Sequence, residues 1–109
     1  MKRIAIALLS LACFSASAEL MTGNKLLDLM NGPADENAAA IGYVIGVADA
    51  TASIVVCAPS TATAGQMYDM VRAYLTGAPA IRHLSGDRIV IRVLSAAWPC
   101  ATKPKGGNV

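Results

Sequence analysis

Hydrophobic residues recur at helical spacing along much of the chain, and Gly and Pro residues interrupt the pattern. Leu26, Leu27 and Met30 form an apolar stripe that follows a helix-start signal, Thr-Gly-Asn, at residues 22–24. Residues 31–33, Asn-Gly-Pro, close this segment, because Gly suits a C-terminal cap and Pro cannot continue a helix. The pattern predicts a short first helix between the two signals.

A second helix is predicted to begin near Asp35 and Glu36, whose charges favour a first turn. Residues 38–56, which follow, are nearly all small or apolar. A helix that is apolar on every side is either the central helix of a bundle or a membrane span. The length and a G-x-x-x-G motif support a span, whereas Asp49 opposes it, because a mid-span Asp costs about 2.5–3.5 kcal/mol. The central bundle helix is the favoured interpretation.

Two further expectations concern this apolar helix. Gly42, Gly46 and Ala50 would form a smooth face that another helix approaches closely. Asp49, if buried, needs a partner, so an internal ion pair or hydrogen bond is expected, with a charged contact to another protein as the alternative. The candidate donors are on the last element: Arg82, His83, Arg88 and Arg92.

The second half of the chain predicts two more elements. Thr63 and Gln66 match a T-x-x-Q capping box, and Gly77 and Pro79 end the helix that it opens. Its apolar stripe consists of Met67, Met70, Val71, Tyr74 and Leu75. The last element is expected over residues 80–98, with Pro99 as its stop. Its stripe fits a helix, but the Val and Ile residues at 89–94 leave a strand open. Together these elements predict an all-α fold, a single small bundle of about four helices over residues 19–100.

The N-terminus has the three parts of a secretory signal peptide. Lys2 and Arg3 precede an apolar run at residues 4–14, and residues 16–18, Ala-Ser-Ala, form a small-x-small cleavage site. Cleavage after Ala18 would deliver the mature chain to the periplasm. Cys13 raises the alternative of a lipoprotein, which Ser10 disfavours because a large aliphatic residue is usual three residues before the modified Cys.

Loss of the signal peptide removes Cys13 and leaves Cys57 and Cys100. In an oxidising compartment two lone cysteines are more often bridged than free, so a Cys57–Cys100 disulfide is expected, with two separate buried thiols as the alternative. The bridge would join the ends of the second and fourth helices, and Trp98 would pack over it. Residues 101–109 are polar and Gly-containing and are expected to form a loose tail.

Charge and chemistry exclude several classes of function. Without Lys2 and Arg3, the nine basic residues become seven and balance the seven acidic residues, so no nucleic-acid partner is expected. His83 is the single histidine and lacks the further ligands that a zinc site needs. No catalytic or metal site and no cofactor is therefore expected, and the three tyrosines are expected in the core or at its rim.

Six motifs, in the same order along the chain, resemble those of the type VI secretion amidase-immunity (Tai-like) family. They are Leu26-Leu27, the G-Y-V-I-G-V-A-D-A run at 42–50, Cys57-Ala58-Pro59, the helix-opening residues 64–67 with V-x-x-Y-L at 71–75, Pro79-x-x-Arg82-His83, and Ala97-Trp98-Pro99-Cys100. Many relatives carry a second cysteine pair at positions that hold Met30 and Ala40 here. The first helix would then be packed against the second, with these two apolar residues filling the vacated space.

The resemblance implies a periplasmic helical protein, often a homodimer and without catalytic activity, that binds a peptidoglycan amidase effector and blocks its active-site cleft. Contacts are expected from the loop at 58–64, with Pro59, Ser60 and Thr61, and from Arg82 and His83. The alternatives are a periplasmic binding or acid-stress chaperone-like protein of the same fold and a small membrane protein that uses residues 38–56 as a span.

Overall fold

The structure, a computed structural model that describes residues 20–101, confirms the all-α prediction. Its elements are α1 (Gly23–Met30), α2 (Ala34–Thr51), α3 (Ala64–Gly77), the 3-10 helix η1 (Pro79–Ile81) and α4 (Gly86–Ala97). The predicted signal peptide at 1–18, Cys13 and the tail residues 102–109 lie outside the described residues.

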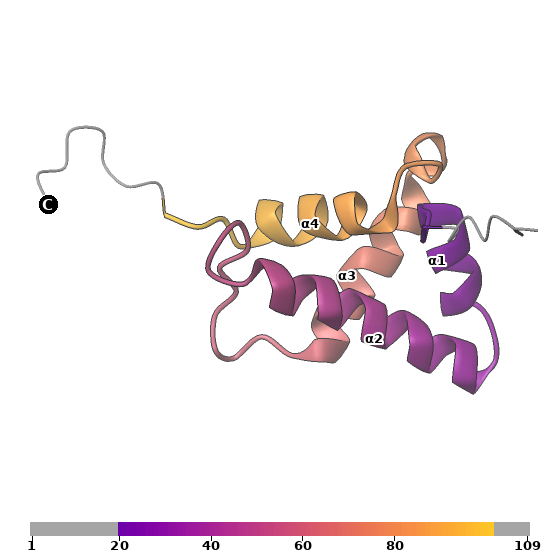
Figure 1. Ribbon diagram of the computed structural model, residues 1–109, viewed down its shortest axis with the longest axis horizontal. Coiled ribbons are helices and arrows are strands. Elements are labelled where there is room, and N and C mark those ends of the chain that lie inside the picture. Colours follow the sequence, from indigo (N-terminus) through magenta and orange to yellow (C-terminus); the bar gives the residue numbers. More distant parts are fainter. Residues whose placement is uncertain (1–19, 102–109) are drawn as a thin grey trace, which may run out of the picture.

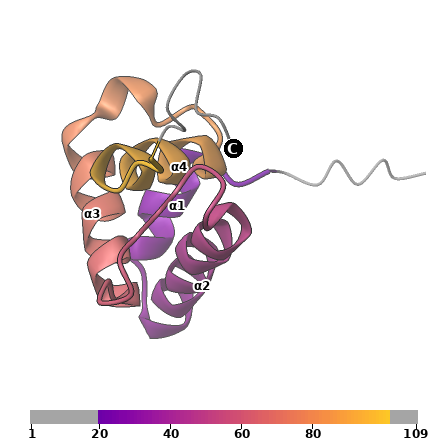
Figure 2. The same ribbon diagram turned by 90° about the vertical axis from the view of Figure 1, so that its left-hand side faces the viewer.

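The four helices form one small bundle in which α2 and α4 run in the same direction (Figure 1). Their C-terminal ends therefore meet at one end of the bundle, and Figure 2 looks onto this end. α1 and the connection from α3 to α4 lie at the opposite end. Each of the four helices contacts the other three, and α2, the longest of them, packs against α1, α3 and α4.

The core is built on one stripe of α2. Ala40, Val44 and Ala48 are buried and follow one another at a spacing of one helical turn. Because Ala is small at two of these three positions, the neighbouring helices can approach α2 closely. They contribute the larger buried side chains Leu26, Val71, Leu75, Ile89, Val90 and Leu94.

Met30 and Ala40, at the positions of the missing cysteine pair, are both buried core residues, which confirms that apolar side chains occupy this space. Hydrogen bonds link the first two helices here. The Asn37 side-chain amide donates to the Met30 carbonyl oxygen at 2.9 Å and to the Tyr68 hydroxyl at 2.6 Å. The Tyr68 hydroxyl donates to the same Met30 carbonyl at 3.3 Å. The end of α1 is thus tied to both α2 and α3 without a second disulfide.

The expected close helix contact at Gly42, Gly46 and Ala50 is wrong, since all three residues are exposed. A methyl group added at Gly42 or Gly46 would meet no other atom within 4 Å. The reason is geometric: α2 has 18 residues, and its three neighbours cover one side of it. The expected buried partner of Asp49 is wrong for the same reason, because Asp49 lies on the exposed side.

The apolar segment 38–56 does not form one helix. α2 ends at Thr51, whose hydroxyl donates to the Val47 carbonyl oxygen at 2.7 Å, and residues 52–56 form a turn. Within residues 20–101, none of the helices combines the length and the hydrophobicity that crossing a bilayer requires.

The last element is a helix, so the strand alternative is wrong, but this helix begins at Gly86 and not near residue 80. Amides of α1 donate hydrogen bonds to carbonyl oxygens of the residues just before this helix. The Gly23 amide donates to the Leu84 carbonyl oxygen at 2.9 Å, and the Asn24 amide donates to the Arg82 carbonyl oxygen at 2.8 Å. These tertiary bonds hold residues 82–85 outside the helix.

One hydrogen bond of the predicted capping box at the start of α3 is confirmed: the Thr63 hydroxyl accepts from the Gln66 amide at 3.1 Å.

Replacing Gly46 by Ala is expected to raise the free energy of unfolding by about 0.5–1 kcal/mol, because Ala restricts the unfolded chain and meets no clash on the exposed face. Gly23→Ala is the matched control. Its Cβ would lie 2.5 Å from Ile89 Cδ1 and 2.9 Å from the Arg82 carbonyl oxygen, so it should destabilise. Urea denaturation measures both, and a Gly46→Ala variant as unstable as Gly23→Ala would contradict the exposed placement.

The predicted disulfide is confirmed between Cys57 and Cys100, whose Cα atoms are 4.8 Å apart. Cys57→Ser or Cys100→Ser is expected to lower the free energy of unfolding by about 2–4 kcal/mol, because the bridge no longer restricts the unfolded chain. Denaturation of the wild type with and without reductant provides the comparison. Equal midpoints in the two conditions would show that the bridge contributes nothing.

Candidate functional site

The end of the bundle where α2 and α4 finish carries a tight turn, residues 51–56, here named the 51–56 turn. The Thr51 carbonyl oxygen accepts from the amides of Ile54, Val55 and Val56 at 3.1, 3.1 and 3.2 Å, and the Ser53 amide donates to the Val56 carbonyl oxygen at 2.9 Å. Ser53 has a φ of 63°, in the left-handed region that residues other than Gly adopt at a cost. Every amide from 53 to 56 is therefore hydrogen-bonded, and the backbone conformation is closely defined.

The turn is attached to the end of α4 by a backbone bridge and by the disulfide. Val56 is buried and forms a backbone bridge with Pro99. The Cys57 amide donates to the Trp98 carbonyl oxygen at 2.9 Å, and Cys57 is bonded to Cys100. We call residues 56–57 and 98–100 together the junction. The junction fixes the C-terminal end of the 51–56 turn, and α2 fixes its N-terminal end.

The turn exposes two large apolar side chains that are adjacent in sequence. Ile54 is 72 % exposed and Val55 is 41 % exposed, and the other exposed large hydrophobic residues within 20–101 are Leu20 and Ile41. Among the described residues of this end, 50–68 and 93–101 contain no Asp, Glu, Lys, Arg or His, and Asp49 lies at their border. We call the surface formed by 50–68 and 93–101 the neutral end.

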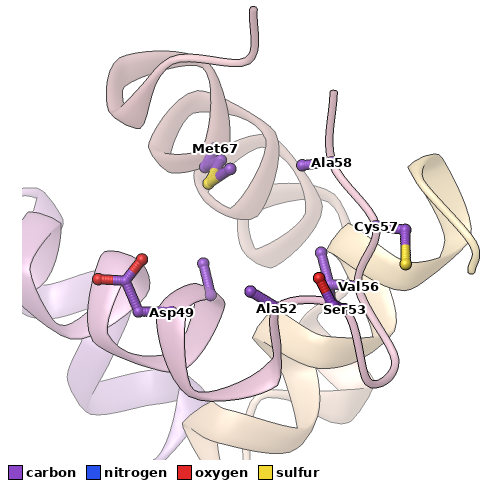
Figure 3. Close-up of a pocket in the computed structure, with 8 residues that line it drawn as sticks. Asp49, Ala52, Ser53, Val56, Cys57, Ala58 and Met67 are labelled. Carbon is purple, nitrogen blue, oxygen red and sulfur yellow. The ribbon is translucent and has the colours of Figure 1, made fainter. Parts of the chain in front are cut away.

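A hollow of about 210 Å³ opens beside the 51–56 turn (Figure 3). Met67 of α3 faces the end of α2 across it, and Ala52, Val56 and Ala58 line the side nearer the turn. Asp49, at its edge, is the charged residue of the lining. The neutral end thus combines a projecting apolar turn with a shallow concave surface.

The sequence-predicted contact residues fall into two groups that the structure does not bring together. Pro59, Ser60 and Thr61 are exposed and follow the turn directly at the neutral end, where the Ala62 amide donates to the Pro59 carbonyl oxygen at 3.0 Å. Arg82 and His83 follow η1 at the other end of α3 (Figure 1). A contact between an effector and either group remains a prediction.

Arg82 has a structural role that its sequence motif did not reveal. Its Nε donates to the Leu75 carbonyl oxygen at 2.6 Å and its Nη2 to the Thr76 carbonyl oxygen at 3.0 Å. The last carbonyl groups of a helix have no partner within the helix, and a cation there also interacts favourably with the helix dipole. Arg82 therefore caps α3, whereas His83 beside it is exposed.

Two titrating groups with shifted pKa values, Asp87 in the first turn of α4 and Tyr43 of α2, lie away from the neutral end. Burial raises the pKa of the Tyr43 hydroxyl, and the charge of nearby Asp87 raises it further. The pKa of Asp87 is lowered, mainly by a hydrogen bond from the Ser85 side chain and then by the Arg88 amide. Within residues 20–101, no three His, Cys, Asp or Glu side chains gather to form a metal site.

Comparison with known families identifies the class of protein to which the chain belongs. The profile of the Rap1a immunity proteins matches residues 22–100, which include all four α-helices, the disulfide-bonded Cys57 and Cys100, and the 51–56 turn. The chain belongs to the Rap1a immunity protein family. No curated protein matches the chain significantly. Since the Rap1a family is a type VI secretion immunity family, the match confirms the class of family that the sequence motifs indicated.

Sequence reasoning did not identify Ile54 and Val55 as surface residues. The apolar pattern of residues 38–56 predicts a helix that includes them, because a run of hydrophobic residues next to a helix is normally part of the core. One signal was present: Ser53, a residue type that favours turns, precedes three β-branched residues at 54–56, a residue type that disfavours a helix.

Arg82→Ala is expected to lower the free energy of unfolding by about 1.5–3 kcal/mol, the range for hydrogen bonds from a charged group. Arg82→Lys should recover part of this loss, because a single ammonium group cannot reproduce the planar fork that reaches both carbonyl groups. Thermal and urea denaturation measure the effect. Unchanged stability in Arg82→Ala would show that Arg82 does not cap α3.

Proposed function

We propose that this protein is an exported immunity protein that binds a peptidoglycan amidase effector of a type VI secretion system and blocks it. The observation that carries the proposal is the family match over residues 22–100. The protein acts by binding, without catalytic activity of its own. The amidase as the target rests on the motifs from Leu26 to Cys100 that resemble the amidase-immunity family.

Placement in the periplasm is supported by two features of the chain. The first 18 residues have the pattern of a signal peptide, with Ala18 at the cleavage site. The Cys57–Cys100 bond suits an oxidising compartment such as the periplasm. An effector that attacks the cell wall reaches the same compartment, so inhibitor and target would meet there.

We also propose that the protein forms a homodimer. Its support, beyond the resemblance, is the exposed face of α2, where Gly42, Gly46 and Ala50 present a smooth surface that nothing in the monomer covers.

The loop residues Pro59, Ser60 and Thr61 are proposed as part of the effector contact. The balanced charge of the mature chain argues against nucleic acid as a partner.

The direct test uses the amidase encoded beside this gene, with both proteins purified. The oxidised mature chain is expected to form a stable complex with that amidase and to abolish release of fragments from purified peptidoglycan at equimolar ratio. An amidase from an unrelated secretion cluster is the control and should remain active. Absence of both complex and inhibition with the neighbouring amidase would contradict the proposal.

A further inference from the structure

We infer that the 51–56 turn is the principal contact of this protein with its effector, and that Ile54 and Val55 enter an uncharged, apolar concavity on the effector surface. This inference rests on the proposed function, because it assigns a surface to the partner proposed above. It differs from the sequence-based expectation, which placed the contact at residues 58–64 and at Arg82 and His83.

The first argument is exposure. A single exposed hydrophobic residue on a protein surface requires no explanation, because much of any protein surface is apolar. Here Ile54 and Val55 are adjacent, are 72 % and 41 % exposed, and occupy the outside of a turn whose next residue, Val56, is buried. Two large β-branched side chains held together in water are unfavourable for an isolated monomer and favourable when a partner covers them.

The second argument is rigidity. The Thr51 carbonyl oxygen accepts three amide hydrogen bonds, and the junction holds the following residues against α4. Binding therefore loses little backbone entropy at the turn, and β-branched side chains have few rotamers to lose. The left-handed conformation of Ser53 is an unfavourable local state that the surrounding contacts maintain, a feature that clusters at functional sites.

The third argument, charge, identifies the kind of partner. Asp49, at the edge of the hollow, is exposed, but residues 50–68 and 93–101 contain no charged residue, so the turn itself has nothing with which to pair a charged patch. A partner that placed Lys, Arg, Asp or Glu directly over Ile54 and Val55 would lose the hydration of that charge without compensation. The complementary surface is therefore uncharged and concave, with room for a branched aliphatic side chain.

A second copy of the chain fits this requirement less well than the effector. A projecting turn needs a concave receptor, and the hollow at the same end is only about 210 Å³ and has Asp49 in its lining. Interface residues that carry most of the binding energy are typically central, desolvated and surrounded by weaker contacts. Pro59, Ser60 and Thr61, which are exposed and follow the junction residue Cys57 closely in sequence, are assigned to such a surround.

The test measures the affinity of the oxidised mature protein for the amidase encoded beside its gene. Ile54→Asp is expected to weaken binding by about 30-fold or more, and Ile54→Ala, which adds no charge, by about tenfold. Leu20→Asp is the matched control. It places the same charge at a residue that is 79 % exposed and lies beside the start of α1, the helix at the opposite end of the bundle, and its affinity should stay within about threefold of the wild type.

Three outcomes would overturn the inference while leaving the proposed function intact. Ile54→Asp could bind as tightly as the wild type, or Leu20→Asp could weaken binding equally. The third is a change in oligomeric mass by light scattering in Ile54→Asp, which would assign the turn to a second copy. Equal melting temperatures of the variants and the wild type exclude misfolding as the cause of any loss. If the wild type itself neither binds nor inhibits the amidase, the proposed function falls and this inference with it.

Discussion

The junction between residues 56–57 and 98–100 is the constraint on which the arrangement at the neutral end depends. α2 and α4 run in the same direction, so their C-terminal ends meet at one end of the bundle, where a connection across them adds to the packing of the two helices. The disulfide, the Cys57–Trp98 hydrogen bond and the burial of Val56 provide that connection together. In a domain of four helices, the shortest with eight residues, such a covalent restraint supplements a core of limited size.

The junction also separates two kinds of apolar residue that are adjacent in sequence. Val56 belongs to the core, whereas Ile54 and Val55 are directed to solvent by the left-handed conformation of Ser53. If the turn continued as helix, these side chains would follow the helical period of α2. The backbone conformation at Ser53 therefore places Ile54 and Val55 together on the surface, whereas a continued helix would place them at different positions around its axis. This links the stability of the bundle end to the surface that we assign to effector binding.

Much of the fold was predictable from the sequence because local signals and tertiary structure agree. Residues that are close in sequence determine three of the predicted features: the Thr63 cap, the Gly-Pro stop after α1 and the regular apolar stripe of α3. The start of α4 was not predictable, since the carbonyl groups of Leu84 and Arg82 are held by α1, which is distant in sequence. The exposure of Asp49 and of Gly46 was missed because hydrophobicity alone does not reveal how many neighbours surround a helix. The candidate site was missed for a related reason: a run of apolar residues predicts burial, and only the turn geometry places Ile54 outside.

Amide hydrogen exchange in the oxidised and reduced protein tests most directly whether the junction holds the 51–56 turn in one conformation. In the oxidised protein we expect slow exchange at the hydrogen-bonded amides of Ser53, Ile54, Val55, Val56 and Cys57. On reduction these amides should exchange faster by a larger factor than those of the core residues Val44 and Val71. Equal exchange rates at the turn in the two redox states, or unprotected amides in the oxidised protein, would contradict this expectation.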